Sequence, residues 1–163
     1  MDRLITLAEI KKAREALPPF VRRTPILPFS GNSTEVGAEN LFLKAENLQV
    51  TGAYKIRAAF TVLNSLSPEE RAKGVVLTSS GNFAQAFGFA GARMGVSIAV
   101  VMLDRTSAYK VAATRGYRAE VVFCGTDALA RQPAVVEIAK ERGMCAIDTW
   151  EEPMGTAGPG TLG

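Results

Sequence analysis

Lys55 is the residue of this sequence whose type and setting could do chemistry most directly. It stands in the stretch "VTGAYKIRAAF", behind a Thr-Gly turn and at the expected start of a helix. Gly52 permits a close backbone approach, Tyr54 offers a ring face, and Ala58 and Ala59 keep bulk away. A lysine in a partly dry pocket can act as a nucleophile and form a Schiff base with an aldehyde cofactor. The alternative interpretation is an ordinary solvated helix lysine, the usual setting for this residue type.

The loop "TSSGNFAQA" is the second candidate for chemistry. Ser79, Ser80, Gly81 and Asn82 lie at an expected strand-to-helix junction, where free amide groups and the helix dipole favour an anion such as a carboxylate or a phosphate. Serine and asparagine are also good helix N-caps, so the same residues can be explained without a ligand. From this loop alone both interpretations stay open.

The elements that must position these residues alternate along the chain. Short apolar runs, "VVLT", "VSIAVVM", "AEVVFC" and "MCAI", predict strands. Helices are expected between and before them, at about 54–66, 83–94, 108–116 and 127–142. This alternation predicts a parallel sheet covered by helices. In such sheets ligands bind at the carboxyl ends of the strands, which is where residues 79–82 would lie.

The remaining segments are less regular. Thr6 and Glu9 have the spacing of a capping box, and Pro18-Pro19 would end the helix that follows it. "VRRTPILPFS" is expected to be extended, "NLFLKAEN" to be a strand running into a loop, and "SPEERAKG" to be a capped polar turn. The last segment, "DTWEEPMGTAGPGTLG", is expected to lack a helix or strand that fixes it, either as a frayed tail or as the lead-in to a further element.

Composition excludes several function classes. The chain has 163 residues, 47% of them hydrophobic, and a net charge of +3, which suits one substantial core. It contains no histidine, so histidine-based triads and histidine-ligated metals are excluded, and Cys124 and Cys145 fit no metal-ligand spacing. The basic doublets Lys11-Lys12 and Arg22-Arg23 lie apart from aromatic residues, so nucleic-acid binding is not expected. Without a signal peptide or a membrane-length apolar run, we expect a cytoplasmic protein that does not enter a membrane.

Three motifs in the same order resemble one known family. "LKAENLQVTGAYKIRAAF", "GVVLTSSGNFAQAFGFAGARMG" and "KVAATRGYRAEVVFCG" are similar to the serine/threonine dehydratases, as is the opening "AEIKKAREALPPFVRRTPIL". These are pyridoxal-phosphate enzymes of the tryptophan-synthase-β fold type. The resemblance implies the N-terminal half of a three-layer α/β fold, with a parallel sheet and helices on both faces. It also implies a division into residues 1–52 from a large domain, a small domain at 53–150, and the start of a return to the large domain at 151–163.

The resemblance assigns a role to each matching residue. Lys55 matches the lysine that forms the Schiff base with pyridoxal phosphate, Tyr54 the residue that packs against the cofactor ring, and Asn82 the asparagine that bonds the cofactor's phenolic oxygen. The matches to the substrate-carboxylate loops are Thr51, Ser79, Ser80, Gly81 and Asn82. No metal site is implied.

The implied reaction is a β-elimination. Lys55 would abstract the α-proton of L-threonine or L-serine, the β-hydroxyl would leave, and the product would hydrolyse to a 2-oxo acid and ammonia. Ser80 leaves a second activity open, because serine racemases resemble "SSGN" and use that serine as an acid or base. The expected partner is a small hydroxy amino acid, and the expected assembly is a homo-oligomer.

The sequence departs from the family pattern at several positions. Phe83 replaces a histidine, which removes a donor near the substrate carboxylate, and Ala58 and Arg118 replace glycines. Family members also continue past the region matched here and carry a glycine-rich phosphate loop there. We therefore expect this chain alone to bind the cofactor weakly, and a non-catalytic fragment that binds a partner chain is an alternative. A nucleotide-binding domain is disfavoured, because "SSGN" is no G-x-G-x-x-G.

Overall fold

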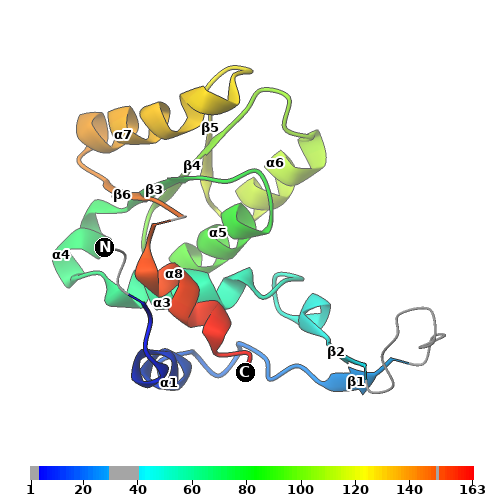
Figure 1. Ribbon diagram of the computed structural model, residues 1–163. Coiled ribbons are helices and arrows are strands. Elements are labelled where there is room, and N and C mark those ends of the chain that lie inside the picture. The colour runs from blue at the N-terminus through cyan, green and yellow to red at the C-terminus, as the bar shows by residue number, and fades with distance from the viewer. Residues whose placement is uncertain (1–3, 30–40, 150) are drawn as a thin grey trace.

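The computed structural model describes residues 4–29, 41–149 and 151–163 (Figure 1). The strands are β1 (Ile26–Pro28), β2 (Phe42–Lys44), β3 (Val75–Thr78), β4 (Ile98–Met102), β5 (Glu120–Phe123) and β6 (Cys145–Ile147). The helices are α1 (Leu7–Glu15), α3 (Lys55–Ser65), α4 (Pro68–Lys73), α5 (Asn82–Met94), α6 (Ala108–Gly116), α7 (Arg131–Arg142) and α8 (Pro153–Gly160), with 3-10 turns η1 (Glu46–Leu48) and η2 (Ala128–Ala130).

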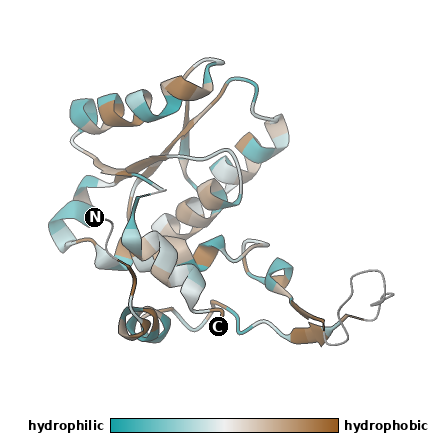
Figure 2. Cartoon of the chain, viewed as in Figure 1, coloured by the Kyte–Doolittle hydropathy of each residue, from teal (hydrophilic) through white to brown (hydrophobic). Residues whose placement is uncertain are grey.

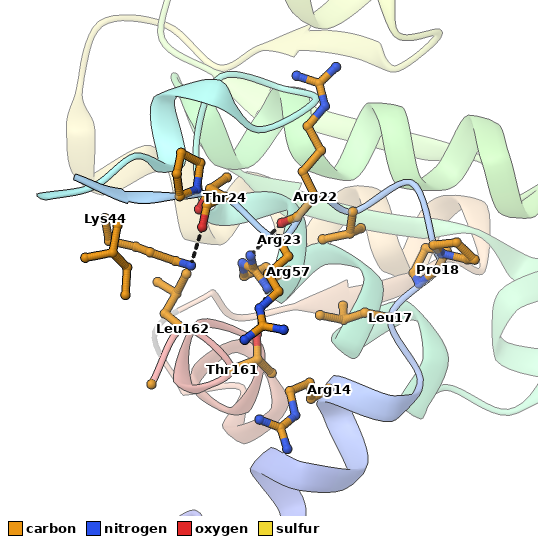
Figure 3. Close-up of a pocket in the computed structure, with 15 residues that line it drawn as sticks. Arg14, Leu17, Pro18, Arg22, Arg23, Thr24, Lys44, Arg57, Thr161 and Leu162 are labelled. Carbon is orange, nitrogen blue, oxygen red and sulfur yellow. Dashed lines mark hydrogen bonds between the residues drawn. The ribbon is translucent and has the colours of Figure 1, made fainter.

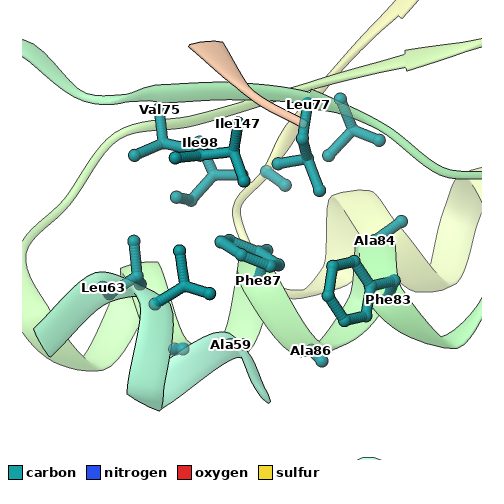
Figure 4. Close-up of a cluster of buried hydrophobic side chains, with 14 of the residues drawn as sticks. Ala59, Leu63, Val75, Leu77, Phe83, Ala84, Ala86, Phe87, Ile98 and Ile147 are labelled. Carbon is teal, nitrogen blue, oxygen red and sulfur yellow. The ribbon is translucent and has the colours of Figure 1, made fainter. Parts of the chain in front are cut away.

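A four-stranded parallel sheet forms the centre of the fold, in the order β5-β4-β3-β6. Its side chains alternate between two faces because successive residues of a strand point to opposite sides. One face packs against α3 and α5. Phe87 of α5 is the largest fully buried side chain in this cluster (Figure 4). The other face packs Val76 and Val101 against Val135 and Ile138 of α7. The predicted parallel sheet with helices on both faces is therefore confirmed.

A separate antiparallel ribbon is formed by β1 and β2. It extends away from the body of the molecule in Figure 1, and Figure 2 colours it mostly as hydrophobic. Ile26 and Phe42 are 63% and 57% exposed, so the ribbon buries little of its apolar surface against the described chain. The predicted extended segment and the predicted strand near residue 42 are both present.

Two expectations about local structure were wrong. The segment "SPEERAKG" forms the short helix α4 rather than a turn, because Ser67 and Glu70 make a complete capping box. The last segment is also helical, since Glu152 caps α8 and α8 packs against α3. Gly158 makes this packing possible: a Cβ there would lie only 2.6 Å from the Cα of Ala58. The absence of a side chain at Gly158 therefore lets the backbones of α8 and α3 approach each other closely at Ala58.

Other local expectations hold. The capping box of Thr6 and Glu9 begins α1 as predicted. Arg118 has a positive φ of 64°, the conformation that a glycine would adopt without strain, which fits its place at a family glycine position. The division at residues 52 and 150 stays a prediction. Within the described ranges, no helix is long and apolar enough to cross a membrane.

Candidate active site

Lys55 is the first residue of α3 and is partly exposed. The turn before it closes through a 2.8 Å bond in which the amide of Gly52 donates to the carbonyl of Gln49. Gly52 has a φ of +72°, so glycine is required there for its backbone conformation, while the space around it is open. The turn thus delivers Lys55 at the mouth of α3, as predicted from the sequence.

The amino group of Lys55 lies against two aromatic rings. Its Nζ is 4.9 Å from the ring centroid of Tyr54 and 4.8 Å from that of Phe83. In the described part of the chain it has no hydrogen bond and no ion pair. Because Phe83 belongs to α5, these contacts place the starts of α3 and α5 side by side.

The start of α5 keeps free amide groups. The hydroxyl Oγ of Ser79 accepts from the amides of Gly81 (3.4 Å) and Ala84 (3.3 Å), so this serine does cap the helix. Its own O–H proton is not used in these two bonds and remains available to a ligand. The amides of Asn82 and Phe83 have no partner among the described residues, as is usual in a first helical turn. Capping and anion binding are therefore compatible at this loop.

Ser80 and Asn82 stand on either side of Gly81. Ser80 is partly exposed, and its Oγ accepts a long 3.4 Å hydrogen bond from Thr106, in the loop after β4. Asn82 is the first residue of α5 and is exposed. Gly81 has no atom within 4 Å of the position that a Cβ would occupy, so open space surrounds it. The contact with Thr106 was not predicted, since nothing in the sequence spacing joins these two loops.

Thr51 has a buried hydroxyl that finds no hydrogen-bond partner among the described residues. Its side chain is 8% exposed, and it lies in the turn that leads into α3. A buried polar group without a partner costs free energy of about 1–3 kcal/mol, and such groups are rare in native proteins. An unsatisfied hydroxyl in the turn that precedes Lys55 is therefore a candidate ligand-binding group.

A buried polar network lies behind the first turn of α3. The guanidinium of Arg57 donates to both carboxylate oxygens of Glu46, at 3.1 and 3.0 Å, and to the hydroxyl of Thr161 at 3.2 Å. It also donates to the carbonyl of Arg22 at 2.9 Å, and Thr24 donates to Glu46. Burial raises the pKa of the Glu46 carboxyl, but the hydrogen bonds from Arg57 and Thr24 outweigh burial and lower the pKa below its usual value. Sequence reasoning missed this network, because its members are far apart along the chain.

A large cavity lies away from the predicted site residues. It has a volume of about 870 Å³ and is lined by the segment after α1, by Arg57 and by the residues after α8 (Figure 3). Arg14, Arg23 and Lys44 make its wall basic. It shares no lining residue with the predicted site at residues 51–55 and 79–82, so the candidate site is defined by its unsatisfied groups rather than by this cavity.

The chain belongs to the pyridoxal-phosphate dependent enzyme family, whose model matches residues 17–163. It is 34% identical over 160 residues to the L-threonine dehydratase catabolic TdcB of Staphylococcus aureus strain N315, covering 98% of this chain and 46% of that protein. It therefore spans about half the length of the curated relatives that it matches.

Solved structures agree with this assignment. The serine racemase of Dictyostelium discoideum superposes with a TM-score of 0.86 at 34% identity, covering 97% of this chain and 51% of that one. A threonine deaminase from T.th. gives a TM-score of 0.85 at 34% identity, covering 97% of this chain and 49% of that one. The resemblance to dehydratases and racemases and the α/β fold class predicted from the sequence are both confirmed.

The described residues fit the family cofactor, pyridoxal phosphate. An aldehyde needs an amine without a competing partner, and among the described residues Lys55 Nζ lies over two rings and has no hydrogen bond or ion pair. A flat ring needs an apolar or aromatic wall, which Tyr54 and Phe83 offer. The unpartnered hydroxyl of Thr51 and the open space around Gly81 leave room and polar groups for an anionic ligand. The individual roles of Asn82, Ser79 and Ser80 stay predictions.

Proposed function

We propose that this chain supplies the lysine-bearing part of an ammonia-lyase that converts L-threonine or L-serine to a 2-oxo acid and ammonia. The observation that carries the proposal is the unpaired amino group of Lys55 beside the free amides at the start of α5. The similarity to an L-threonine dehydratase supports the substrate class.

The carboxylate of the amino acid would be bound by the loop after β3 and by the turn before α3. Backbone amides of Asn82 and Phe83 point along the helix axis, where the dipole favours an anion. The hydroxyls of Ser79 and Thr51 would donate to the same carboxylate, which would satisfy the buried Thr51 Oγ1. These contacts would hold the amino acid so that its Cα faces Lys55.

Pyridoxal phosphate, when bound, supplies an aldehyde that bonds to amines and a ring that accepts electrons. Tyr54 would contact that ring, and Asn82 would bond its phenolic oxygen. Lys55 Nζ would hold the cofactor and then take the proton from the substrate Cα. The first turns of α3 and α5 contain no acidic residue and the chain contains no histidine, so Lys55 is the base available on its side of the site.

Racemisation is the second candidate activity, and Ser80 is the residue that favours it. Thr106 donates to Ser80 Oγ, so the Ser80 proton remains free to be given to a substrate carbon. The similarity to a serine racemase supports this alternative. The third candidate is a non-catalytic fragment that keeps the fold and binds a partner chain. Homo-oligomer formation and a cytoplasmic location stay predictions.

Cofactor capture by Lys55 is tested by incubating the purified chain with pyridoxal phosphate and reducing with borohydride. Peptide mass spectrometry then locates the reduced adduct. We expect it at Lys55, absent in Lys55→Ala and retained in Lys73→Ala, which removes an exposed lysine of α4. An adduct spread evenly over the exposed lysines would refute the assignment of Lys55.

Turnover is tested separately by measuring 2-oxo acid from L-threonine and L-serine, and D-serine from L-serine. We expect little turnover from this chain alone, because no stretch of its sequence matches the family's glycine-rich phosphate loop. Robust 2-oxo acid formation would contradict that expectation while supporting the lyase. If D-serine forms instead and disappears in Ser80→Ala, racemisation is the function.

A further inference from the structure

Phe83 connects the hydrophobic core to the reactive lysine. It is the second residue of α5, is only 8% exposed, and packs its ring against Phe87 with centroids 5.1 Å apart (Figure 4). The same ring also contacts Lys55 Nζ, 4.8 Å from the centroid. The ring is therefore held from behind by core packing and touches the amino group in front.

The positive ends of two helices repel the charged amino group of Lys55 from the position where it lies. Lys55 begins α3 and Phe83 lies at the start of α5, so two positive helix ends meet there. Neither first turn contains an acidic side chain, and no described residue forms an ion pair with Lys55. The ring faces of Tyr54 and Phe83 are the contacts that attract the ammonium, through the negative face of the aromatic quadrupole.

We propose that Phe83 is a positioning residue for Lys55. With Tyr54 it forms an aromatic slot, defined by these two rings, that holds the free amino group at the start of α5 before the aldehyde arrives. This inference rests on the proposed function and adds to it a role for the residue that departs from the family's histidine. A histidine at this position would gain a positive charge as the pH falls and would then repel the ammonium, which phenylalanine cannot do.

The two walls of the slot are unequal. Tyr54 is 38% exposed, whereas Phe83 is 8% exposed and backed by Phe87. Phe83 is thus the buried, packed wall and Tyr54 the exposed one. Replacing Phe83 should therefore disturb the amino group more than replacing Tyr54.

The slot is tested by reductive methylation of the lysines with ¹³C-formaldehyde, which keeps the positive charge. An amino group over two ring faces gives an upfield ring-current-shifted methyl signal, assigned by its absence in Lys55→Arg. We expect this shift in the wild type and in Phe83→Tyr, and a loss of most of it in Phe83→Leu. Tyr54→Leu should lose less. In Phe83→Leu the ratio of slot-held to free amino group should fall about 2- to 5-fold, which corresponds to one cation–π contact of about 0.5–1 kcal/mol.

Phe89→Leu is the matched control, because Phe89 lies on the same helix and contacts Phe20 and Tyr117 instead of Lys55. It should leave the shifted signal in place. Tyr54→Leu replaces a partly exposed side chain and should fold normally, so it still tests the slot if Phe83→Leu folds poorly. A wild-type Lys55 signal at the position of the other lysines, or one unchanged in both Leu variants of the slot, overturns the proposal.

Failure of the slot and failure of the proposed function can be told apart. A shifted Lys55 signal together with an adduct spread evenly over the exposed lysines means that the slot exists and the cofactor role is wrong. A trapped adduct at Lys55 with an unshifted signal means that the cofactor role stands and the slot is wrong. With both present, Phe83→Leu should lower the share of adduct at Lys55 relative to Lys73 in the same molecule.

Discussion

Replacing Glu46 by glutamine tests the buried network that holds the first turn of α3. The side chains of Arg57 and Glu46 are only 7% and 9% exposed, and the carboxylate accepts two bonds from Arg57 and one from Thr24. Glutamine keeps the shape but removes the charge, and it turns one acceptor into a donor that faces the Arg57 guanidinium. Removing one partner of a buried pair leaves the other charge uncompensated, which costs about 3–5 kcal/mol when the whole side chain is lost.

We expect Glu46→Gln to lower the free energy of unfolding by about 3 kcal/mol, because one acceptor oxygen is kept. For a chain of this size that is a fall in Tm of about 6–12 °C. Urea unfolding followed by circular dichroism measures the first quantity, and a thermal scan measures the second. Glu120→Gln is the matched control, since its ion pair with Arg142 has side chains 54% and 42% exposed and should contribute at most about 1 kcal/mol.

The pH dependence checks the same reasoning. The pKa of Glu46 in the folded chain is lowered from the ordinary value of 4.5: burial raises it, but the Arg57 and Thr24 hydrogen bonds outweigh burial. A lowered folded-state pKa gives stability that is present above the unfolded-state pKa and is lost as the pH falls through the folded-state pKa. The stability difference between wild type and Glu46→Gln should therefore narrow as the pH falls below about 4.5. Equal losses in Glu46→Gln and Glu120→Gln, or a difference that widens in acid, would refute the assignment of a buried ion pair.

Three further substitutions test particular elements by urea unfolding. Gly158→Ala should destabilise by about 1–3 kcal/mol, because its Cβ would lie 2.6 Å from the backbone of Ala58; a neutral effect would mean that α8 does not pack there. Arg118→Gly should stabilise by about 1 kcal/mol by relieving the φ of 64°, and a loss of stability would show that the Arg118 side chain matters more than its backbone. Ser67→Ala should lower the free energy of unfolding by about 1 kcal/mol through loss of the α4 capping box. An unchanged value would mean that packing alone fixes this helix.

The sheet and its helices could be predicted because local signals agree with the tertiary structure. The strands predicted at residues 75–78 and 96–102 are present as β3 and β4, and β4 begins at Ile98. Both are almost wholly apolar and buried on both faces. The helix predicted at 108–116 has those bounds in the structure. The helix at residues 153–160 was not predicted because its glycines have low helix propensity; the Glu152 cap and the packing against α3 support it in the structure.

The parts of the candidate site that are formed by neighbouring residues in the sequence could be predicted. Lys55 and the loop at 79–82 could be located because a strand end or a turn precedes each of them. The contact between Phe83 and Lys55 could not be predicted, since it depends on how α3 and α5 pack against each other. Phe83 could be noticed in the sequence only as a missing histidine, and the structure shows that its ring touches the lysine instead.

What marks this site is a concentration of unsatisfied groups. Thr51 has the buried side-chain oxygen that lacks a partner within the described residues, whereas buried Thr24 and Gln49 both make hydrogen bonds. Further along the same turn, Lys55 has ring contacts but no polar partner in the described chain, and the first amides of α5 are free. A stable fold normally pairs a buried hydroxyl, so the unpaired Thr51 oxygen is not explained by packing alone, whereas free amides are usual in a first helical turn. Under the proposed function, the carboxylate of an amino acid would accept from the hydroxyl and the amides, and an aldehyde cofactor would bond to the lysine.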